Sequence, residues 1–145
     1  MRLVGLLGGT FNPIHNGHLR LAQELADALN FSEVRFIPSA NPPHKTAPKI
    51  SAQHRAARVQ LAITDHSLFK LDTRELDRTG ASYTIDTLIS LQEELGGSAA
   101  LCLIMGSVVC QAQHLASLAN AYRLLPHHIS ATTCERHPAP IIRRT

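Results

Sequence analysis

Short apolar runs are spaced along the first hundred residues of the chain. The first run, Leu3–Leu7, is continuously apolar and ends at Gly8-Gly9, which is typical of a strand buried on both faces of a sheet. Val34–Pro38, Phe69–Leu71 and Ala99–Met105 show the same kind of pattern. The sequence therefore predicts four strands, each too short for a helix of ordinary length.

Amphipathic segments separate these runs. In Gly17–Leu29 the apolar residues recur at helical spacing and fall on one face. Segments 51–64 and 82–95 also have helical spacing, and Gly96-Gly97 ends the second of them. The expected helix caps are Ser51 in one segment and Ser82 or Thr84 in the other. The positions expected to face inward are Val59, Ala62, Ile63, Ile85, Leu88, Ile89 and Leu95, whereas Arg55 and Arg58 are expected to be solvated.

The alternation of strands and helices predicts the fold class. An order of β-α-β-α-β-α-β is typical of an α/β domain with a Rossmann-like parallel sheet, helices on both faces and right-handed crossovers. Ligands of such sheets bind beyond the carboxyl ends of the strands. The unusual loops of this chain all follow strand ends, so we expect them to converge on one edge.

Composition narrows the class of protein. Hydrophobic residues make up 44% and charged residues 17%, which is ordinary for a globular domain. The net charge of +3 is too weak to indicate nucleic-acid binding but suits a small anionic substrate. No apolar run could span a membrane, and the start has no signal cleavage pattern, so we expect a cytoplasmic protein with free thiols. No standard metal-ligand template fits the late histidines and cysteines, which are Cys110, His114, His127, His128, Cys134 and His137.

The strongest candidate for chemistry is the segment after the first strand. Gly8 and Gly9 allow the backbone to turn and to approach a ligand closely. Thr10 offers a hydroxyl and a backbone N–H group. His15 and His18 lie at the start of a helix, where unpaired N–H groups and the positive dipole end attract anions. The segment therefore predicts a phosphate site that has no Walker lysine.

This segment resembles the G-G-[ST]-F-x-P-x-H-x-G-H signature of the HxGH nucleotidyltransferase superfamily. Within that superfamily the chain is similar to the bacterial nicotinate mononucleotide adenylyltransferases. Asn41–Lys45 resembles their second-strand loop, Glu75–Leu88 their E-x-x-R-x-G-x-S-Y-T-x-D-T-L segment, and Leu103–Ser107 the strand before their G-x-D motif. The resemblance covers residues 1–107.

The resemblance implies that AMP is transferred from ATP to nicotinate mononucleotide, with deamido-NAD and pyrophosphate as products. Catalysis would consist of positioning and charge stabilisation, with Mg²⁺ accompanying ATP and no metal held by the protein. The implied catalytic residues are His15 and His18. The implied residues for ATP are Gly8, Gly9, Thr10, Phe11, His15, His18, Lys45 and Gly106. The implied residues for nicotinate mononucleotide are Asn41, His44, Lys45, Tyr83 and Thr84.

The resemblance stops after Ser107. The family has aspartate where this chain has Val108, and the chain contains no tryptophan for the family's next segment, T-W-x-x-W. We therefore expect a nucleotidyltransferase-like domain over residues 1–107 and an aberrant, poorly structured tail over residues 108–145, with the fifth strand and C-terminal helix missing. A frameshift near Val108 would explain the change, because suitable codons for Gln113–Asn120, read one base later, spell N-T-W-H-R-W-Q.

Three functions remain open at this point. The first is nicotinate-nucleotide adenylyltransferase. The second is a sister enzyme such as pantetheine-phosphate adenylyltransferase, against which the N-P-P-H-K and S-Y-T segments count. The third is an inactive fragment with residual nucleotide binding, which Val108 and the tail favour. The lack of a G-x-G-x-x-G motif with a following acidic residue counts against a conventional dehydrogenase.

Overall fold

The computed structural model describes residues 2–40, 49–80, 83–106 and 129–134 of the chain. Strands and helices alternate as the apolar pattern predicted. The elements are β1 (Arg2–Gly9), α1 (Asn16–Leu29), β2 (Glu33–Pro38), α2 (Ala52–Ile63), β3 (Phe69–Leu71), α3 (Thr84–Leu95), β4 (Ala99–Gly106) and β5 (Ile129–Cys134). Among the described residues, no helix has the length and apolar character needed to cross a bilayer.

The strands form one parallel sheet in the order β3-β2-β1-β4-β5. β1 lies at the centre, where Leu7 pairs with Phe36 of β2 on one side and with Ile104 of β4 on the other. This register brings the carboxyl ends of β1, β2 and β4 to the same edge. The predicted α/β fold with a Rossmann-like parallel sheet is therefore confirmed.

β5 corrects our expectation that the tail contains no strand. Ile129–Cys134 pairs in parallel with β4, from Leu101 opposite Ile129 to Gly106 opposite Cys134. Three of its six residues are β-branched, and such residues favour extended backbone. Pairing also satisfies backbone groups that β4 would otherwise present at a sheet edge. The other residues of the tail, Val108 included, lie outside the described residues.

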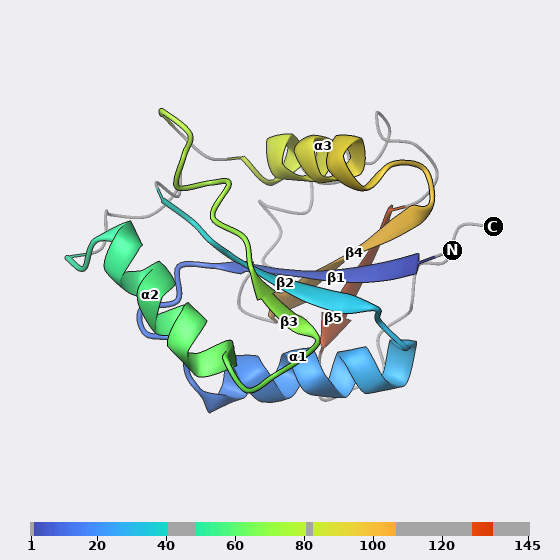
Figure 1. Ribbon diagram of the computed structural model, residues 1–145, viewed down its shortest axis with the longest axis horizontal. Helices are drawn as coiled ribbons and strands as arrows, with labels where there is room; N and C mark the ends of the chain where they lie inside the picture. The colour runs from blue at the N-terminus through green and yellow to red at the C-terminus, as the bar shows by residue number, and fades with distance from the viewer. Residues whose placement is uncertain (1, 41–48, 81–82, 107–128, 135–145) are drawn as a thin grey trace.

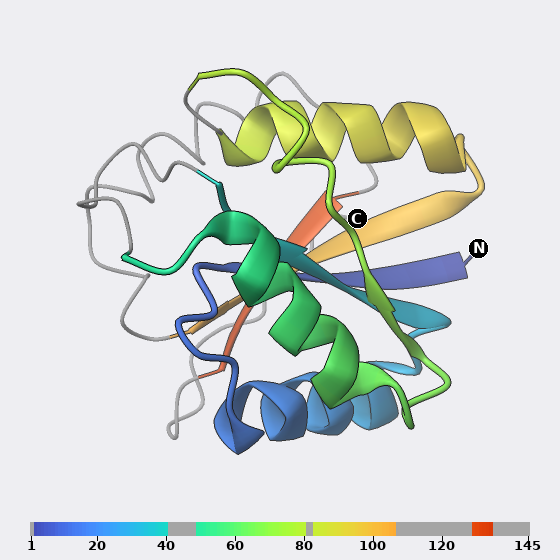
Figure 2. The same ribbon diagram turned by 60° about the vertical axis from the view of Figure 1, so that its left-hand side comes forward.

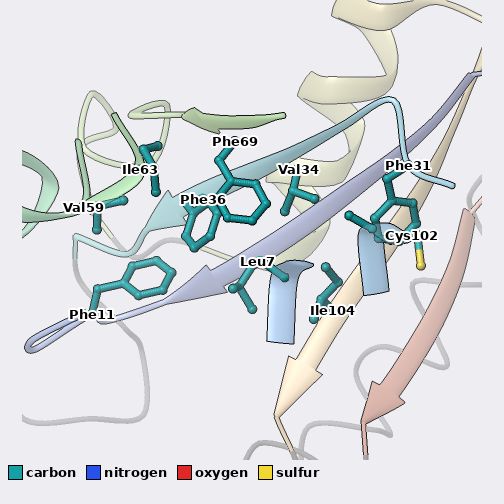
Figure 3. Close-up of a cluster of buried hydrophobic side chains, with 12 residues drawn as sticks. Leu7, Phe11, Phe31, Val34, Phe36, Val59, Ile63, Phe69, Cys102 and Ile104 are labelled. Atoms are coloured by element: carbon teal, nitrogen blue, oxygen red, sulfur yellow. The ribbon is translucent and has the colours of Figure 1, made fainter. Parts of the chain in front are cut away.

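The helices cover both faces of the sheet. Figures 1 and 2 show α1 and α2 on one face and α3 on the other, with the first turn of each helix at the carboxyl end of the sheet. The larger core, drawn in Figure 3, lies on the side of α1 and α2 and contains Leu7, Phe11, Ala22, Ala26, Phe31, Val34, Phe36, Val59, Ile63, Phe69, Cys102 and Ile104. The smaller core lies under α3 and contains Val4, Leu6, Ile37, Leu88, Leu91, Ala99, Leu101 and Leu103.

α3 differs in detail from the prediction. Its N-cap is Tyr83, which makes no side-chain capping bond, and Thr84 is the first helical residue, so Thr84 is not the cap. Ile89 is 42% exposed, whereas Leu91 is buried. Leu91 faces inward in place of Ile89, because Leu91 lies three residues after Leu88 on the face of the helix that meets the sheet.

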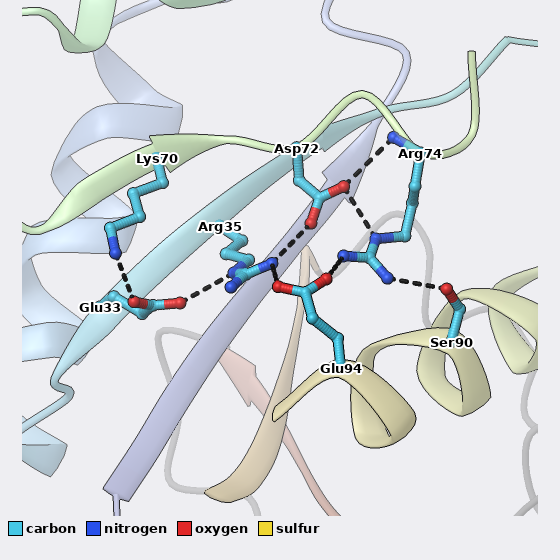
Figure 4. Close-up of polar contacts among 7 residues, drawn as sticks. All are labelled: Glu33, Arg35, Lys70, Asp72, Arg74, Ser90 and Glu94. Atoms are coloured by element: carbon cyan, nitrogen blue, oxygen red, sulfur yellow. Dashed lines mark hydrogen bonds and ion pairs between the residues drawn. The ribbon is translucent and has the colours of Figure 1, made fainter. Parts of the chain in front are cut away.

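Ion pairs fix α3 to the β2–β3 edge of the sheet (Figure 4). Arg35 of β2 contacts Asp72 at 3.0 Å and Glu94 of α3 at 2.9 Å. Arg74 contacts the same two carboxylates and also donates to Ser90 at 2.8 Å. Burial alone would raise the pKa of Asp72, but hydrogen bonds from Arg74 and Arg35 outweigh it and lower that pKa. The network thus holds α3, the helix that follows Tyr83.

Candidate functional site

The site begins where β1 ends. Gly8 and Gly9 are the last residues of β1 and pair with Ile37 and Pro38 of β2. The turn itself comes at Phe11, whose φ is 48°, so our interpretation that the glycines make the turn was wrong. A Cβ atom on Gly8 would come no nearer than 3.9 Å to another described atom. Among the described residues, a side chain at Gly8 would therefore meet no close contact.

Phe11 anchors this turn. Its side chain is 2% exposed and joins the larger core, where its ring lies 5.9 Å from that of Phe36. It also forms a T-shaped pair with the ring of His18, with ring centroids 5.1 Å apart and an interplanar angle of 74°. A left-handed conformation is costly for a bulky residue, so burial of this ring holds the backbone there. Packing of Phe11 in the core thus fixes the turn and places an aromatic ring against one side of His18.

His15 and His18 form a reciprocal cap at the start of α1. His15 is the N-cap, and its Nδ1 accepts a hydrogen bond from the Gly17 backbone N–H at 3.1 Å. The backbone N–H of His15 donates to Nδ1 of His18 at 3.2 Å. The two ring centroids are 3.9 Å apart, and the planes are inclined by 31°. The pair predicted from the sequence is therefore brought together at a helix N-terminus.

These hydrogen bonds define the protonation of the pair. An Nδ1 atom that accepts a hydrogen bond carries no proton, so each neutral ring holds its proton on Nε2. Burial lowers the pKa of His18, and the nearby charge of His15 lowers it further. Each ring therefore offers one Nε2–H donor that the cap does not use, beside a helix dipole that favours anions.

Arg55 corrects a second expectation. We predicted a solvated charge, but its side chain is 1% exposed beneath the loop that follows β1. Its Nη1 donates to the Thr10 carbonyl and its Nη2 to the Ser39 carbonyl at 2.8 Å. A signal was present in the sequence, since Arg55 is four residues before Val59 and therefore lies on the buried face of α2.

Gly106 lies on the same sheet edge as Gly8 and Gly9. It is the last residue of β4, the strand that neighbours β1. Tyr83 and Thr84 are exposed at the start of α3, whose first turn also lies at the carboxyl end of the sheet. The remaining predicted residues, Asn41, His44 and Lys45, lie outside the described residues.

The segment before α3 is tethered by buried polar contacts. The Thr87 hydroxyl donates to Glu75 Oε1 at 2.8 Å, and Arg78 Nη1 donates to the same hydroxyl at 2.9 Å. Burial raises the pKa of Glu75, while Thr87 and Arg78 oppose that rise. These residues belong to the E-x-x-R-x-G-x-S-Y-T-x-D-T-L segment, and their contacts join its two ends. The tether therefore restricts where Tyr83 can lie.

Similar proteins support the interpretation of these motifs. A probable nicotinate-nucleotide adenylyltransferase of Halorhodospira halophila is 51% identical over 106 residues, which cover 73% of this chain and 48% of that protein. One of Aeromonas salmonicida is 52% identical over 103 residues, which cover 71% of this chain and 48% of that protein. The chain spans about half the length of the curated relatives it matches. The relatives confirm the resemblance predicted from the sequence.

Solved structures share the fold. A putative nicotinate-nucleotide adenylyltransferase from Vibrio parahaemolyticus matches with a TM-score of 0.69 and 18% identity, covering 97% of this chain and 82% of that one. A Plasmodium falciparum nicotinic acid mononucleotide adenylyltransferase complexed with NaAD matches with a TM-score of 0.62 and 13% identity, covering 95% and 78%. The cytidylyltransferase-like family model matches residues 6–140. With this match over nearly the whole chain, and with the paired histidines at the carboxyl edge of a parallel sheet, the chain belongs to the cytidylyltransferase-like family.

Proposed function

We propose that this chain is a nicotinate-nucleotide adenylyltransferase, which transfers AMP from ATP to nicotinate mononucleotide. The observation that carries the proposal is the capped pair of His15 and His18, which presents two N–H donors beside a helix N-terminus. The relatives of about 50% identity carry the same activity in their names.

In the proposed reaction, a 5′-phosphate oxygen of nicotinate mononucleotide attacks the α-phosphorus of ATP. The bond to pyrophosphate breaks, and deamido-NAD forms. His15 and His18 donate from Nε2 to phosphate oxygens, and the positive dipole end of α1 adds to the attraction of the phosphates. Negative charge grows on the leaving pyrophosphate, so donors fixed before the reaction stabilise the transition state. Gly8, Gly9 and Gly106, which have no side chains, allow the nucleotide to approach the strand ends closely.

The substrate-binding parts of the proposal concern the other predicted residues. Thr10 and Phe11 place the α-phosphate, Lys45 lies over the phosphates, and Asn41, His44, Tyr83 and Thr84 contact nicotinate mononucleotide. The hydrogen bonds of Thr87 with Glu75 and Arg78 support the assignment of Tyr83, because they hold the segment before α3 in place.

Magnesium and location belong to the same proposal. Among the described residues, no group of three His, Cys, Asp or Glu side chains could hold a metal ion. We propose that Mg²⁺ accompanies ATP, with most of its coordination supplied by phosphates and water, and no step is assigned to the metal. Both substrates are small anions of the cytoplasm, and we propose that location for the chain.

The test is pyrophosphate release by the full chain, with ATP and one of three acceptors. Nicotinate mononucleotide is expected to support release, and nicotinamide mononucleotide and phosphopantetheine are the comparisons. His15→Asn preserves a capping residue but removes an Nε2 donor. We therefore expect the rate of pyrophosphate release to fall about 10- to 150-fold, which corresponds to the loss of one charge-assisted hydrogen bond. His66→Asn, beyond the end of α2, is the matched control and should leave the rate unchanged.

Each other outcome identifies an alternative. Release only with phosphopantetheine would assign the sister activity and refute the proposal. A folded chain that binds ATP but gives no release with any acceptor would be a nucleotide-binding protein without transferase activity.

A further inference from the structure

A single buried cation joins the loops at the carboxyl edge of the sheet. Arg55 projects from the first turn of α2 and donates to the carbonyl groups of Thr10, Ser39 and Ile50, the last at 3.4 Å from Nε. Thr10 follows β1, Ser39 follows β2, and Ile50 comes just before α2. The three acceptors therefore belong to three separate segments that share this guanidinium as a donor.

The partners of Arg55 are unusual for so deeply buried a charge. Arginine is rarely buried completely unless a carboxylate pairs with it. Arg35 and Arg74 follow that rule, but Arg55 takes part in none of the ion pairs between described residues. Removing a guanidinium from water costs several kcal/mol, which neutral carbonyl groups offset only through well-aligned hydrogen bonds. Packing alone would be served better by an apolar side chain, so the position and direction of the donors are what this residue supplies.

The contacts of Arg55 lead directly to the histidine pair. Thr10, whose carbonyl accepts from Arg55, is followed by Phe11 at the left-handed turn. The ring of Phe11 packs edge-on against His18, and His18 in turn accepts from the backbone of His15. The link to Ser39 adds to the backbone bond from the Ser39 N–H to the Gly9 carbonyl at 2.9 Å. Displacement of Thr10 would therefore move both imidazole rings.

We propose that Arg55 is a positioning residue, which ties the Thr10–Phe11 turn to the end of β2 and thereby holds the His15–His18 pair ready for phosphate. This inference deepens the proposed function and rests on it for the identity of the ligand. The positioning itself is a property of the free protein. It can therefore be measured without ATP.

The test compares Arg55→Gln, Arg55→Lys and the control Arg58→Gln, an exposed arginine on the same helix. Amide hydrogen exchange is followed in free protein, in peptides that cover Thr10–His18 and the end of β2. Arg55→Gln should raise exchange there by about ten-fold while the middle of β4 keeps its protection, because only the local opening becomes easier. Arg55→Lys, which retains a cation and reaches fewer carbonyl groups, should give a smaller increase. Arg58→Gln should match the original chain.

Activity gives a second readout in the same variants. Arg55→Gln is expected to raise KM for ATP and to lower kcat, since both binding and reaction depend on the histidine pair, and Arg55→Lys should restore part of both.

Unchanged exchange over Thr10–His18 in folded Arg55→Gln would overturn the proposal. An equal rise over β1, β2 and β4 would also overturn it, because Arg55 would then serve overall stability alone. If Arg55→Gln does not fold, the same criteria apply to Arg55→Lys. Absence of transferase activity in the original chain would refute the proposed function but leave the exchange result to decide the role of Arg55.

Discussion

Addition of one methyl group at Gly17 should weaken ATP binding while leaving the free energy of unfolding nearly unchanged. Gly17 is the second residue of α1, and its backbone N–H donates to Nδ1 of His15. In Gly17→Ala the new Cβ would lie 2.9 Å from both Cε1 and Nδ1 of His15, well inside the usual carbon contact of about 3.5–4.0 Å. The backbone of the helix is fixed by its own hydrogen bonds, so the exposed imidazole of His15 must move.

The expected magnitudes differ for folding and binding. Alanine favours a helix over glycine by up to about 1 kcal/mol, and loss of an N-cap bond costs about 1 kcal/mol, so the free energy of unfolding should change little. Loss of one charge-assisted contact to phosphate costs about 1.5–3 kcal/mol, which weakens ATP binding by about 10- to 150-fold. The variant should therefore fold normally and bind poorly.

Calorimetry gives the Kd for ATP, and urea unfolding gives the stability. Gly97→Ala is the matched control, because no atom of the described residues, its chain neighbours aside, lies within 4 Å of the added Cβ, and its ATP affinity should be unchanged. An ATP affinity of Gly17→Ala within about twofold of the original chain, a difference of only about 0.4 kcal/mol, would refute the reasoning that His15 contacts phosphate.

Other substitutions test the fold. Gly5→Ala should lower the free energy of unfolding by about 1–3 kcal/mol in a urea titration, because its Cβ would meet the buried ring of Phe31 at 2.7 Å; an unchanged midpoint would refute this account of the packing. Asp72→Asn should cost about 1–3 kcal/mol at pH 7, and this difference should shrink as the pH falls from about 4 through the lowered pKa of Asp72; a difference independent of pH would contradict it. Glu75→Gln should have the opposite pH dependence: because the pKa of Glu75 is raised, the stability that it supplies is full below about pH 4.3 and is lost as the pH rises through the folded pKa. The stability of the variant should therefore rise relative to the original chain between about pH 4 and 8, and unfolding curves that fail to converge at acid pH would count against this account.

Local pattern was enough to predict the central sheet. β1 and β4 are buried on both faces, so they appear in the sequence as continuous apolar runs whose ends are marked by glycine. The HxGH segment could be placed at a helix start because the helical spacing of apolar residues begins at Gly17. Fold class and the histidine pair therefore followed from residues close together in the sequence.

Features that depend on tertiary contacts were missed. Arg55 was interpreted as solvated because charge usually indicates exposure, and its carbonyl partners lie 5, 16 and 45 residues away along the chain. β5 was missed because its stability as a strand depends on the β4 edge, which no local pattern reveals. The turn was assigned to Gly8 and Gly9, but burial of Phe11 places it one residue beyond Thr10.

The central claim is that the two imidazole rings at the start of α1 bind triphosphate through Nε2. ¹⁵N NMR of the histidine side chains during addition of Mg-ATP tests it most directly, since the Nε2 signals report hydrogen bonding at each ring. The account predicts that the Nε2 signals of His15 and His18 shift together and saturate, whereas those of His54 and His66 stay constant. Saturable ATP binding that leaves the His15 and His18 signals unmoved would contradict it.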